Sequence, residues 1–441
     1  MVRVAAIEDR GLGNSSYVVD LGDGSALVVD PERDPRPYLQ TAQQLGVQVR
    51  HVAETHLHAD FVSGARELAA EGASHIAPRQ SFLAFPHRAV GEGDLLEVGD
   101  LLLRVLETPG HTPEHVAYLL QDGQTPLTLF SGGTLMVGGV ARPDLISPNL
   151  TVELSHLAYE SVHRLLTTLP EEVELRPTHG GGSFCSSAGA SRSAASTVGS
   201  ERRTHPAMMA SDADRFVKDL LAGLGTYPPY FHRLREINRR GPKTFGTGLP
   251  RLSPVLPDDL ADQTLIDVRP IASFASGHIP GAVSIELRDQ FGTWLGWLFE
   301  PGTPLVFVLA PDQDERNLVS QALNTGYENL TGKIALDDWV LAGNELAAID
   351  LVSASQIERG TPLVDVRQLS EWKMGHVAGA THLELGEIAA NPGRVEQTVV
   401  LQCGHGQRAM TAASILARSG TRVAGVTTAS QGEINRALSG Q

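Results

Sequence analysis

The stretch ETHLHADFVSG, residues 54–64, decides how the first half of the chain is interpreted. His56, His58 and Asp60 stand at alternate positions where a strand gives way to a loop. This spacing lets both histidines approach one metal ion, with Asp60 joining them or orienting them. Phe61, the next residue, cannot bind metal. The pattern therefore predicts a metal site whose ligand set is altered.

Two further histidines lie in similar places. His111 belongs to TPGHTPEH (residues 108–115), which follows an apolar strand, and His179 belongs to RPTHGGG (residues 176–182). Up to about residue 180, short apolar runs alternate with helix-like stretches such as PRPYLQTAQQLG, residues 35–46. This mixture predicts a layered α/β sandwich with its chemistry at the ends of the strands.

Composition limits the partners of the chain. Its 441 residues exceed what one hydrophobic core usually serves, so several domains are expected. The formal charge of −16 argues against nucleic acid and against an anionic membrane surface. Without a signal-like segment or a long apolar stretch, we expect a cytoplasmic protein. The only two cysteines, Cys185 and Cys403, exclude a disulfide framework.

The second half of the chain contains a repeat. A Gly- and Pro-rich segment, residues 238–259, predicts a domain boundary near residue 250. Beyond it, LIDVRPIASFASGHIPGAVSIEL (265–287) aligns without gaps with LVDVRQLSEWKMGHVAGATHLEL (363–385), at an offset of 98 residues. Each copy begins with a buried strand that suits a parallel sheet. The expected domains are 1–250, 251–348 and 349–441.

The second copy ends in TVVLQCGHGQRAMTAASILARSG, residues 398–420. An apolar strand runs into a Gly-rich loop, and a helical pattern begins near Arg408. Cys403 therefore lies at a strand-to-helix turn, where converging N–H groups and the helix dipole favour a thiolate. Gly404 and Gly406 allow a tight turn, and Arg408 adds a positive charge. We predict a reactive cysteine, with a buried structural cysteine as the alternative.

The first copy lacks this thiol. Its corresponding segment, PLVFVLAPDQDERN (304–317), places Asp312, Asp314 and Glu315 where the second copy has glycine and histidine. Acidic side chains would repel a persulfide anion. We interpret residues 255–345 as a structural or docking domain.

Both copies resemble rhodanese domains, whose marks are a DVR strand, a GHIPGA turn and a Cys-led loop. The resemblance implies that Cys403 is the nucleophile and persulfide carrier, that Arg408 clamps an anion, and that no cofactor is needed. Donors and acceptors would be thiosulfate, small persulfides and thiols. Under this resemblance the remaining loop residues bind the substrate: Gly404, His405, Gly406 and Gln407.

Residues 1 to about 240 resemble the metallo-β-lactamase fold, an αββα sandwich, and more narrowly its persulfide dioxygenase branch. The resemblance rests on THLHAD, TPGHTPEH, FSGGTL (130–135) and HGGGSFC (179–185). It implies an iron ion held by two histidines and one carboxylate, and His56 and His111 fall on the histidines. Gly133 stands at the carboxylate position, so the iron site is impaired.

Two alternatives could complete the ligand set of this site. His58 could complete a neutral three-histidine set suited to zinc, or Asp60 could move inward. A thioester hydrolase of the glyoxalase II type shares the fold, but it needs two metals bridged by the missing aspartate. Cys185, just after HGGGS, either accepts a persulfide or is an idle thiol.

Three functions compete. The first is a sulfurtransferase of sulfide and persulfide metabolism, with sulfur carried on Cys403. The alternative is an active iron-dependent persulfide dioxygenase that produces sulfite. The second alternative is a non-catalytic protein that binds persulfides or thiols. The sequence leaves open the metal, the physiological sulfur donor and acceptor, and whether the chain forms a homo-oligomer.

Overall fold

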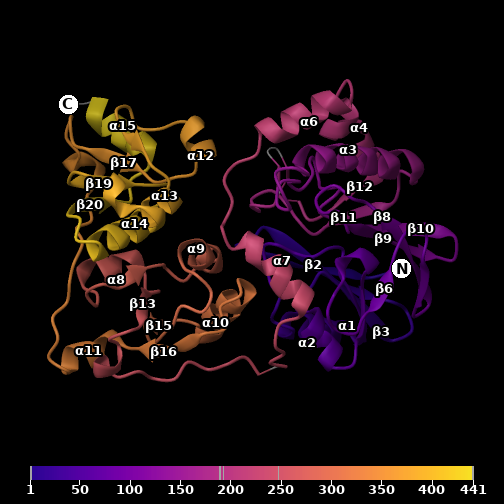
Figure 1. Cartoon of the computed structure of the whole chain (residues 1–441), viewed down its shortest axis with the longest axis horizontal. Coiled ribbons are helices and arrows are strands. Elements are labelled where there is room, and N and C mark those ends of the chain that lie inside the picture. Colours follow the sequence, from indigo (N-terminus) through magenta and orange to yellow (C-terminus); the bar gives the residue numbers. More distant parts are fainter. Residues whose placement is uncertain (1, 188–189, 192, 247, 440–441) are drawn as a thin grey trace. The chain divides into compact units, whose positions relative to one another are not determined.

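The chain folds into two compact units (Figure 1). The computed structural model describes residues 2–187, 190–191, 193–246 and 248–439. The first unit runs to Leu249 and includes Leu323–Gly326, and the second contains Pro250–Ala322 and the residues from Tyr327 onward. Among the described residues, no helix is both long and apolar enough to cross a membrane.

The first unit contains two six-stranded sheets. In one sheet the strands follow chain order, and pairing changes from antiparallel to parallel after β3: β1 (Val4–Asp9), β2 (Asn14–Asp20), β3 (Ser25–Val29), β4 (Gln48–Ala53), β5 (Ser74–Pro78) and β6 (Arg88–Val90). The other sheet has the order β12-β11-β10-β9-β8-β7, in which β10 and β11 pair in parallel and the other neighbours are antiparallel: β7 (Leu95–Val98), β8 (Leu101–Glu107), β9 (Val116–Asp122), β10 (Thr125–Gly132), β11 (Glu174–Pro177) and β12 (Ser196–Thr197).

Helices cover the outer faces of both sheets. Tyr17 and Phe130 meet in the apolar core between the sheets. Leu68 packs on the outside of the first sheet, and Leu166 packs on the outside of the second. These layers confirm the expected αββα sandwich. The helices of this unit are α1 (Arg36–Leu45), α2 (Ala65–Ala70), α3 (Thr151–Thr168), α4 (Val198–Thr204), α5 (Pro206–Met209), α6 (Ala213–Ala222) and α7 (Phe231–Arg240), with the short turn η1 (Arg79–Ser81).

The second unit contains two four-stranded parallel sheets of equivalent strand order, as the internal repeat predicts. The first sheet has the order β14-β13-β15-β16: β13 (Thr264–Asp267), β14 (Val283–Ser284), β15 (Leu305–Val308) and β16 (Leu330–Ile334). The second has the order β18-β17-β19-β20: β17 (Leu363–Asp365), β18 (Thr381–His382), β19 (Val399–Gln402) and β20 (Val423–Thr427).

Helices and short turns connect the strands of both repeats. In the first repeat they are η2 (Pro257–Asp259), α8 (Ile271–Ser276), α9 (Phe291–Leu298), α10 (Glu315–Asn324) and α11 (Leu336–Leu341). In the second they are η3 (Ala354–Gln356), α12 (Leu369–Lys373), α13 (Leu385–Ala390), η4 (Pro392–Arg394), α14 (Gln407–Arg418) and α15 (Gln431–Ser439).

The DVR motif forms the same buried ion pair in both repeats. In the second repeat, Arg367 Nη2 lies 2.6 Å from an Asp365 carboxylate oxygen and also donates to the carbonyl of Gly375, at 2.8 Å. The first repeat forms the equivalent pair between Asp267 and Arg269. Both aspartates are fully buried. The motif therefore ties the first strand of each repeat to the glycine turn that follows it.

Replacing Arg367 with alanine should destabilise the second repeat, because Asp365 would stay buried without its charged partner. Breaking a buried ion pair in this way costs about 3–5 kcal/mol. Urea unfolding of the full chain measures the loss. The control is Arg394→Ala, whose pair with Glu387 is about half exposed and is worth about 1 kcal/mol or less. Equal losses in the two variants would contradict a structural role for the motif.

Candidate functional site

The five ligands expected from the sequence come together in the first unit. His56, His58 and Asp60 follow β4, His111 follows β8 and His179 follows β11. They form two overlapping groups, in each of which the ligand atoms lie within 4.8 Å of one another. One group is His56, His111 and His179, and the other is His58, Asp60 and His179. All five side chains are buried.

In two histidines of the first group, Nδ1 donates a hydrogen bond, so that Nε2 keeps its lone pair. Nδ1 of His111 donates to the carbonyl of Arg142 (2.7 Å), and Nδ1 of His179 donates to the side-chain oxygen of Asn14 (2.8 Å). A neutral imidazole carries one N–H, so both Nε2 atoms are acceptors. Nε2 of His111 is buried and has no hydrogen-bond partner among the described residues. Its surroundings therefore suit a cation.

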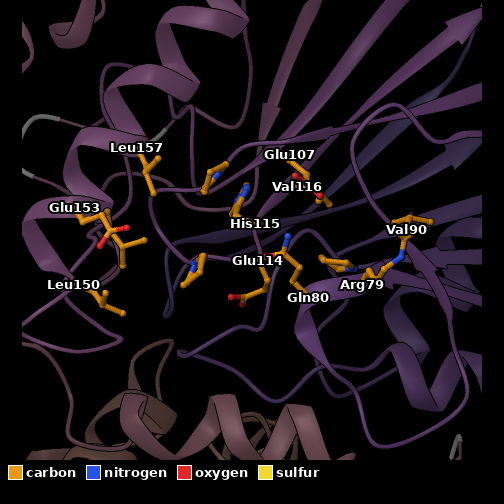
Figure 2. Close-up of a pocket in the computed structure, with 14 residues that line it drawn as sticks. Arg79, Gln80, Val90, Glu107, Glu114, His115, Val116, Leu150, Glu153 and Leu157 are labelled. Carbon is orange, nitrogen blue, oxygen red and sulfur yellow. The ribbon is translucent and has the colours of Figure 1, made fainter.

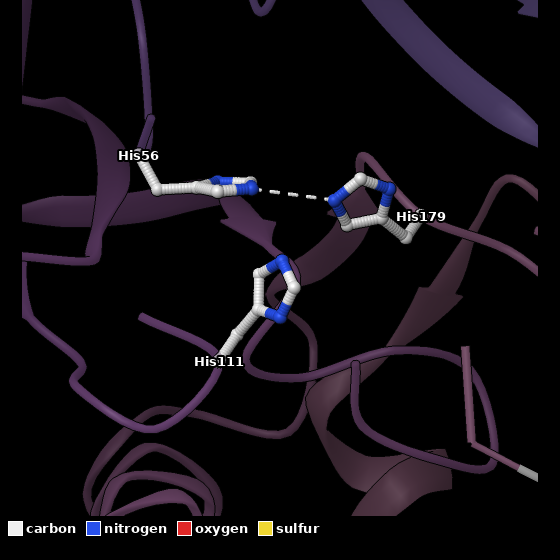
Figure 3. A group of neighbouring side chains, drawn as sticks. All are labelled: His56, His111 and His179. Atoms are coloured by element: carbon white, nitrogen blue, oxygen red, sulfur yellow. Dashed lines mark hydrogen bonds between the residues drawn. The ribbon is translucent and has the colours of Figure 1, made fainter. Parts of the chain in front are cut away.

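His56 presents its Nε2 in the same way. Thr55 Oγ1 donates to Asp30 at 2.8 Å, so it accepts the Nδ1–H of His56, also at 2.8 Å. Nε2 of His56 then faces Nε2 of His179 at 3.3 Å (Figure 3). Two lone pairs at this distance repel unless a proton or a metal ion lies between them. Burial lowers the pKa of His56 well below its ordinary value, and neighbouring histidines lower it further, which keeps the ring neutral.

The ring of His58 lies beside that of His56, with the centroids 4.2 Å apart, but its ligand atom belongs to the second group. Its Nε2 lies 3.2 Å from Asp30, and its ring stacks on Phe61 with the ring centroids 4.2 Å apart. Burial disfavours a charged ring here, but the Asp30 carboxylate outweighs it and raises the pKa of His58. Asp60 accepts a hydrogen bond from Asn14 at 2.8 Å. The histidine that joins His56 and His111 is thus His179, whereas the sequence had suggested His58.

The donor set differs from the iron site that the resemblance implies. Three neutral imidazoles suit a divalent transition metal such as zinc or iron. A carboxylate that joins His56 and His111 would need an acidic side chain at position 133, and Gly133 has none, whereas Asp60 belongs to the second group. The residues present therefore fit a metal ion, but not through the expected carboxylate.

His115 is a buried residue of this cluster to which the sequence assigned no role. Its Nε2 accepts the backbone N–H of Gly133 at 3.0 Å, and its Nδ1 lies 2.8 Å from Thr108 Oγ1. Burial lowers its pKa to about 3. Its ring stacks on His56, with centroids 5.0 Å apart. It therefore fixes the loop around Gly133, and its place in TPGHTPEH was the available signal.

A cavity of about 290 Å³ reaches His115 (Figure 2). Glu114 lines it beside His115, Glu153 and Leu157 line it from α3, and Arg79 contributes a cation. The volume is near the lower end of the range for small-molecule sites, roughly 300–1,000 Å³. Because His115 contacts His56, the cavity adjoins the histidine cluster.

Cys185 is fully buried in an apolar cluster with Leu145 and Tyr230. Burial raises the pKa of its thiol well above the usual value, and the charge of Asp60 raises it further. The thiol is therefore protonated at neutral pH and closed to solvent. This environment favours the idle thiol over the persulfide acceptor.

Cys403 lies between β19 and α14, as the sequence predicted. Its Sγ is buried and accepts the backbone N–H of Gly406 at 3.1 Å. Gly406 precedes the helix with a φ of 91° and no side chain caps it, so the first N–H groups of α14 remain near the loop. Gly404 and Gln407 are half-buried, and His405 is exposed.

Arg408 directs its charge at a carboxylate. Both of its Nη atoms pair with Glu371, and Nη2 lies 2.8 Å from Oε1. Trp294 of α9 lies beside it, with the guanidinium carbon 5.9 Å from the ring centroid. Arg288 is a second, half-buried cation, whose pKa is lowered by burial and by Arg408, while the charge of Cys403 acts in the opposite direction. The repeat without a cysteine thus contributes to the surroundings of Cys403.

Comparison with known proteins agrees with this architecture. The metallo-beta-lactamase superfamily matches residues 9–180, and the rhodanese-like domain matches residues 255–332 and 350–428. Among solved structures, a metallo-beta-lactamase from Staphylococcus aureus subsp. aureus COL has a TM-score of 0.67 at 28% identity, and the match covers 76% of this chain and 99% of that one.

Curated relatives match part of the chain. Hydroxyacylglutathione hydrolase of Methylobacillus flagellatus is 43% identical over 122 residues, which are 27% of this chain and 46% of the relative. The chain thus spans about half the length of that hydrolase. Human mitochondrial persulfide dioxygenase ETHE1 is 29% identical over 197 residues, 44% of this chain and 70% of the relative. The chain therefore contains a metallo-beta-lactamase domain with persulfide dioxygenase homologues, followed by tandem rhodanese-like domains.

Proposed function

We propose that this protein is a sulfurtransferase that carries sulfane sulfur as a persulfide on Cys403. The rhodanese-like domains and the persulfide dioxygenase homologues support a role in sulfur metabolism. The observation that carries the specific activity is the 3.1 Å hydrogen bond from Gly406 N–H to Cys403 Sγ at the start of α14. A backbone N–H aimed at sulfur, beside a helix N-terminus, stabilises an anionic sulfur.

The proposed reaction has two half-reactions. The Cys403 thiolate attacks the outer sulfur of thiosulfate, forming a new S–S bond while the S–S bond of the donor breaks and sulfite leaves with the electron pair. An acceptor thiolate then attacks the outer sulfur of the Cys403 persulfide, and Cys403 leaves as a thiolate. Each half-reaction forms one bond to the transferred sulfur and breaks another without net oxidation or reduction, so no cofactor takes part. Low-molecular-weight persulfides are equivalent donors, with a thiolate as the leaving group.

Arg288 is the group best suited to hold the anionic donor. Arg408 is already neutralised by its two contacts with Glu371. Arg288 has no comparable ion pair among the described residues, and the charge of Cys403 acts on it. A guanidinium in this position binds the sulfonate oxygens of thiosulfate by charge-assisted hydrogen bonds.

A second candidate function, in the first unit, is an iron-dependent persulfide dioxygenase. The observation that favours it is the convergence of one ring nitrogen from each of His56, His111 and His179. A metal held there would supply a positive charge for an anionic persulfide. Oxygen uptake with glutathione persulfide by metal-loaded protein tests it. Absence of oxygen uptake would eliminate this candidate and leave thiol binding as the role of the first unit.

Replacing Cys403 with serine should reduce thiosulfate:cyanide sulfur transfer to background, because the hydroxyl is a far weaker nucleophile. Mass spectrometry of the wild type after thiosulfate treatment should find one added sulfur atom at Cys403. The matched control is Cys185→Ser, which removes the buried thiol and should keep full activity. Full activity in the Cys403→Ser variant would refute the proposal.

Replacing Arg288 with glutamine should raise KM for thiosulfate roughly tenfold and leave kcat within about twofold. The reason is the loss of one charge-assisted contact to the donor, worth about 1.4 kcal/mol. Steady-state kinetics with varied thiosulfate measure the effect. Arg418→Gln, an exposed arginine at the far end of α14, is the control. An unchanged KM in Arg288→Gln would exclude Arg288 from donor binding.

A further inference from the structure

We propose that Glu371 selects the sulfur donor, so that the Cys403 site favours organic persulfides over thiosulfate. This selectivity rests on the proposed sulfur transfer at Cys403 and defines the donor class of that same site. It assigns a role to the carboxylate that occupies both Nη atoms of Arg408, the cation of the Cys403 loop.

Glu371 is a fixed carboxylate. One of its oxygens, Oε1, lies 2.8 Å from Nη2 of Arg408. The other, Oε2, pairs with Nη1 of Arg408 and also accepts the backbone N–H of Gln368 at 3.2 Å, in the capping box at the start of α12. Burial alone would raise the pKa of Glu371, but Arg408 outweighs this effect and lowers it. The carboxylate is therefore ionised at neutral pH and anchored by two partners.

An aromatic side chain adds a further contact to Arg408. Trp294 of α9 lies with its ring centroid 5.9 Å from the guanidinium carbon. Trp294 is buried and stacks on Trp297, with the centroids 5.3 Å apart. Trp297 packs against α13, where a Cβ atom at Gly386 would lie 2.4 Å from the indole nitrogen. To bind a donor, Arg408 would therefore have to leave both a carboxylate and an aromatic ring.

Little positive charge remains for the donor at the Cys403 loop. The charge of Arg408 is cancelled by Glu371. Arg288 is the other cation, and the charges of Cys403, Glu286 and Asp289 all act on it. A donor is therefore favoured when the reaction places few negative charges beside Arg288.

The two donor classes undergo the same substitution but bring different charges. With an organic persulfide, R–S–SH, the Cys403 thiolate attacks the outer sulfur and a new S–S bond forms. The donor S–S bond breaks, the thiolate R–S⁻ leaves with the electron pair, and the proton stays on the transferred sulfur. One negative charge is present throughout.

Thiosulfate is a dianion, so attack by the Cys403 thiolate carries three negative charges and releases sulfite as a dianion. This reaction needs cationic support that Arg408 does not provide while it is paired with Glu371. Glu371 thus discriminates between the donors by an unfavourable charge, and an uncharged side chain at this position should relax the selection.

The rate of loading Cys403 with sulfur tests the proposal, measured on the full chain by acid quenching and mass spectrometry. The donors are 2-hydroxyethyl persulfide, whose carbon chain is uncharged, and thiosulfate. Glu371→Gln removes the charge and keeps an oxygen that can accept the Gln368 N–H. The freed Arg408 gains one charge-assisted contact to thiosulfate, so loading by thiosulfate should become about tenfold faster. Loading by 2-hydroxyethyl persulfide should stay within about threefold.

Glu387→Gln is the matched control. Glu387 caps α13 as Glu371 caps α12, and it pairs with Arg394, but this ion pair is about half exposed. The control should load at the wild-type rate with both donors. General damage to the fold would slow both donors, so it cannot produce the faster loading by thiosulfate that is expected for Glu371→Gln.

The wild type alone decides the matter if Glu371→Gln does not fold. Its loading by 2-hydroxyethyl persulfide should be more than about tenfold faster than by thiosulfate, because like charges placed together cost several kcal/mol. A smaller ratio in the wild type, or an unchanged ratio in folded Glu371→Gln, would overturn donor selection and leave sulfur transfer intact. No loading of Cys403 by either donor would overturn both.

Discussion

The buried carboxylate of Asp30 ties together the loops on which the histidine cluster depends. Asp30 directly follows β3 in a left-handed backbone conformation, with a φ of 50°, and is fully buried. It accepts hydrogen bonds from Thr55 and Thr178, which directly precede His56 and His179. Burial alone would raise the pKa of Asp30, but the adjacent histidine and these hydrogen bonds lower it. One anion thus sets the spacing of two candidate ligands that come from different sheets.

In the second unit a backbone turn, not a buried carboxylate, positions the candidate functional residue. Gly406 turns the loop so that its N–H meets Cys403 Sγ, and a Cβ at this position would lie 2.8 Å from Thr428 and 2.9 Å from Ile271. Ile271 belongs to the repeat that has no cysteine. That repeat keeps the buried Asp–Arg pair and the parallel sheet, and its Ile271 lines the loop that holds Cys403.

Much of the architecture could be predicted from short segments. Apolar runs bounded by turn residues predicted the strands, and the 98-residue repeat predicted two equivalent parallel sheets. The candidate ligands were recognisable because each follows the end of a strand. His115 and Arg288 were not recognised: His115 lies in TPGHTPEH, but its contacts and those of Arg288 are made with distant segments. His115 holds Gly133, 18 residues away, and Arg288 acts on a loop more than a hundred residues further along the chain.

The sequence by itself determined the domain types, the strand–loop–helix turn at Cys403 and the set of histidines from which a metal site could be built. The tertiary structure decided which of them converge. His179 lies 123 residues from His56, and Asn14, which aims its ring, lies 165 residues from His179. The same holds for Cys185, whose burial depends on packing against α7. Ring orientation and burial arise from contacts between distant segments, and a pattern confined to neighbouring residues does not contain them.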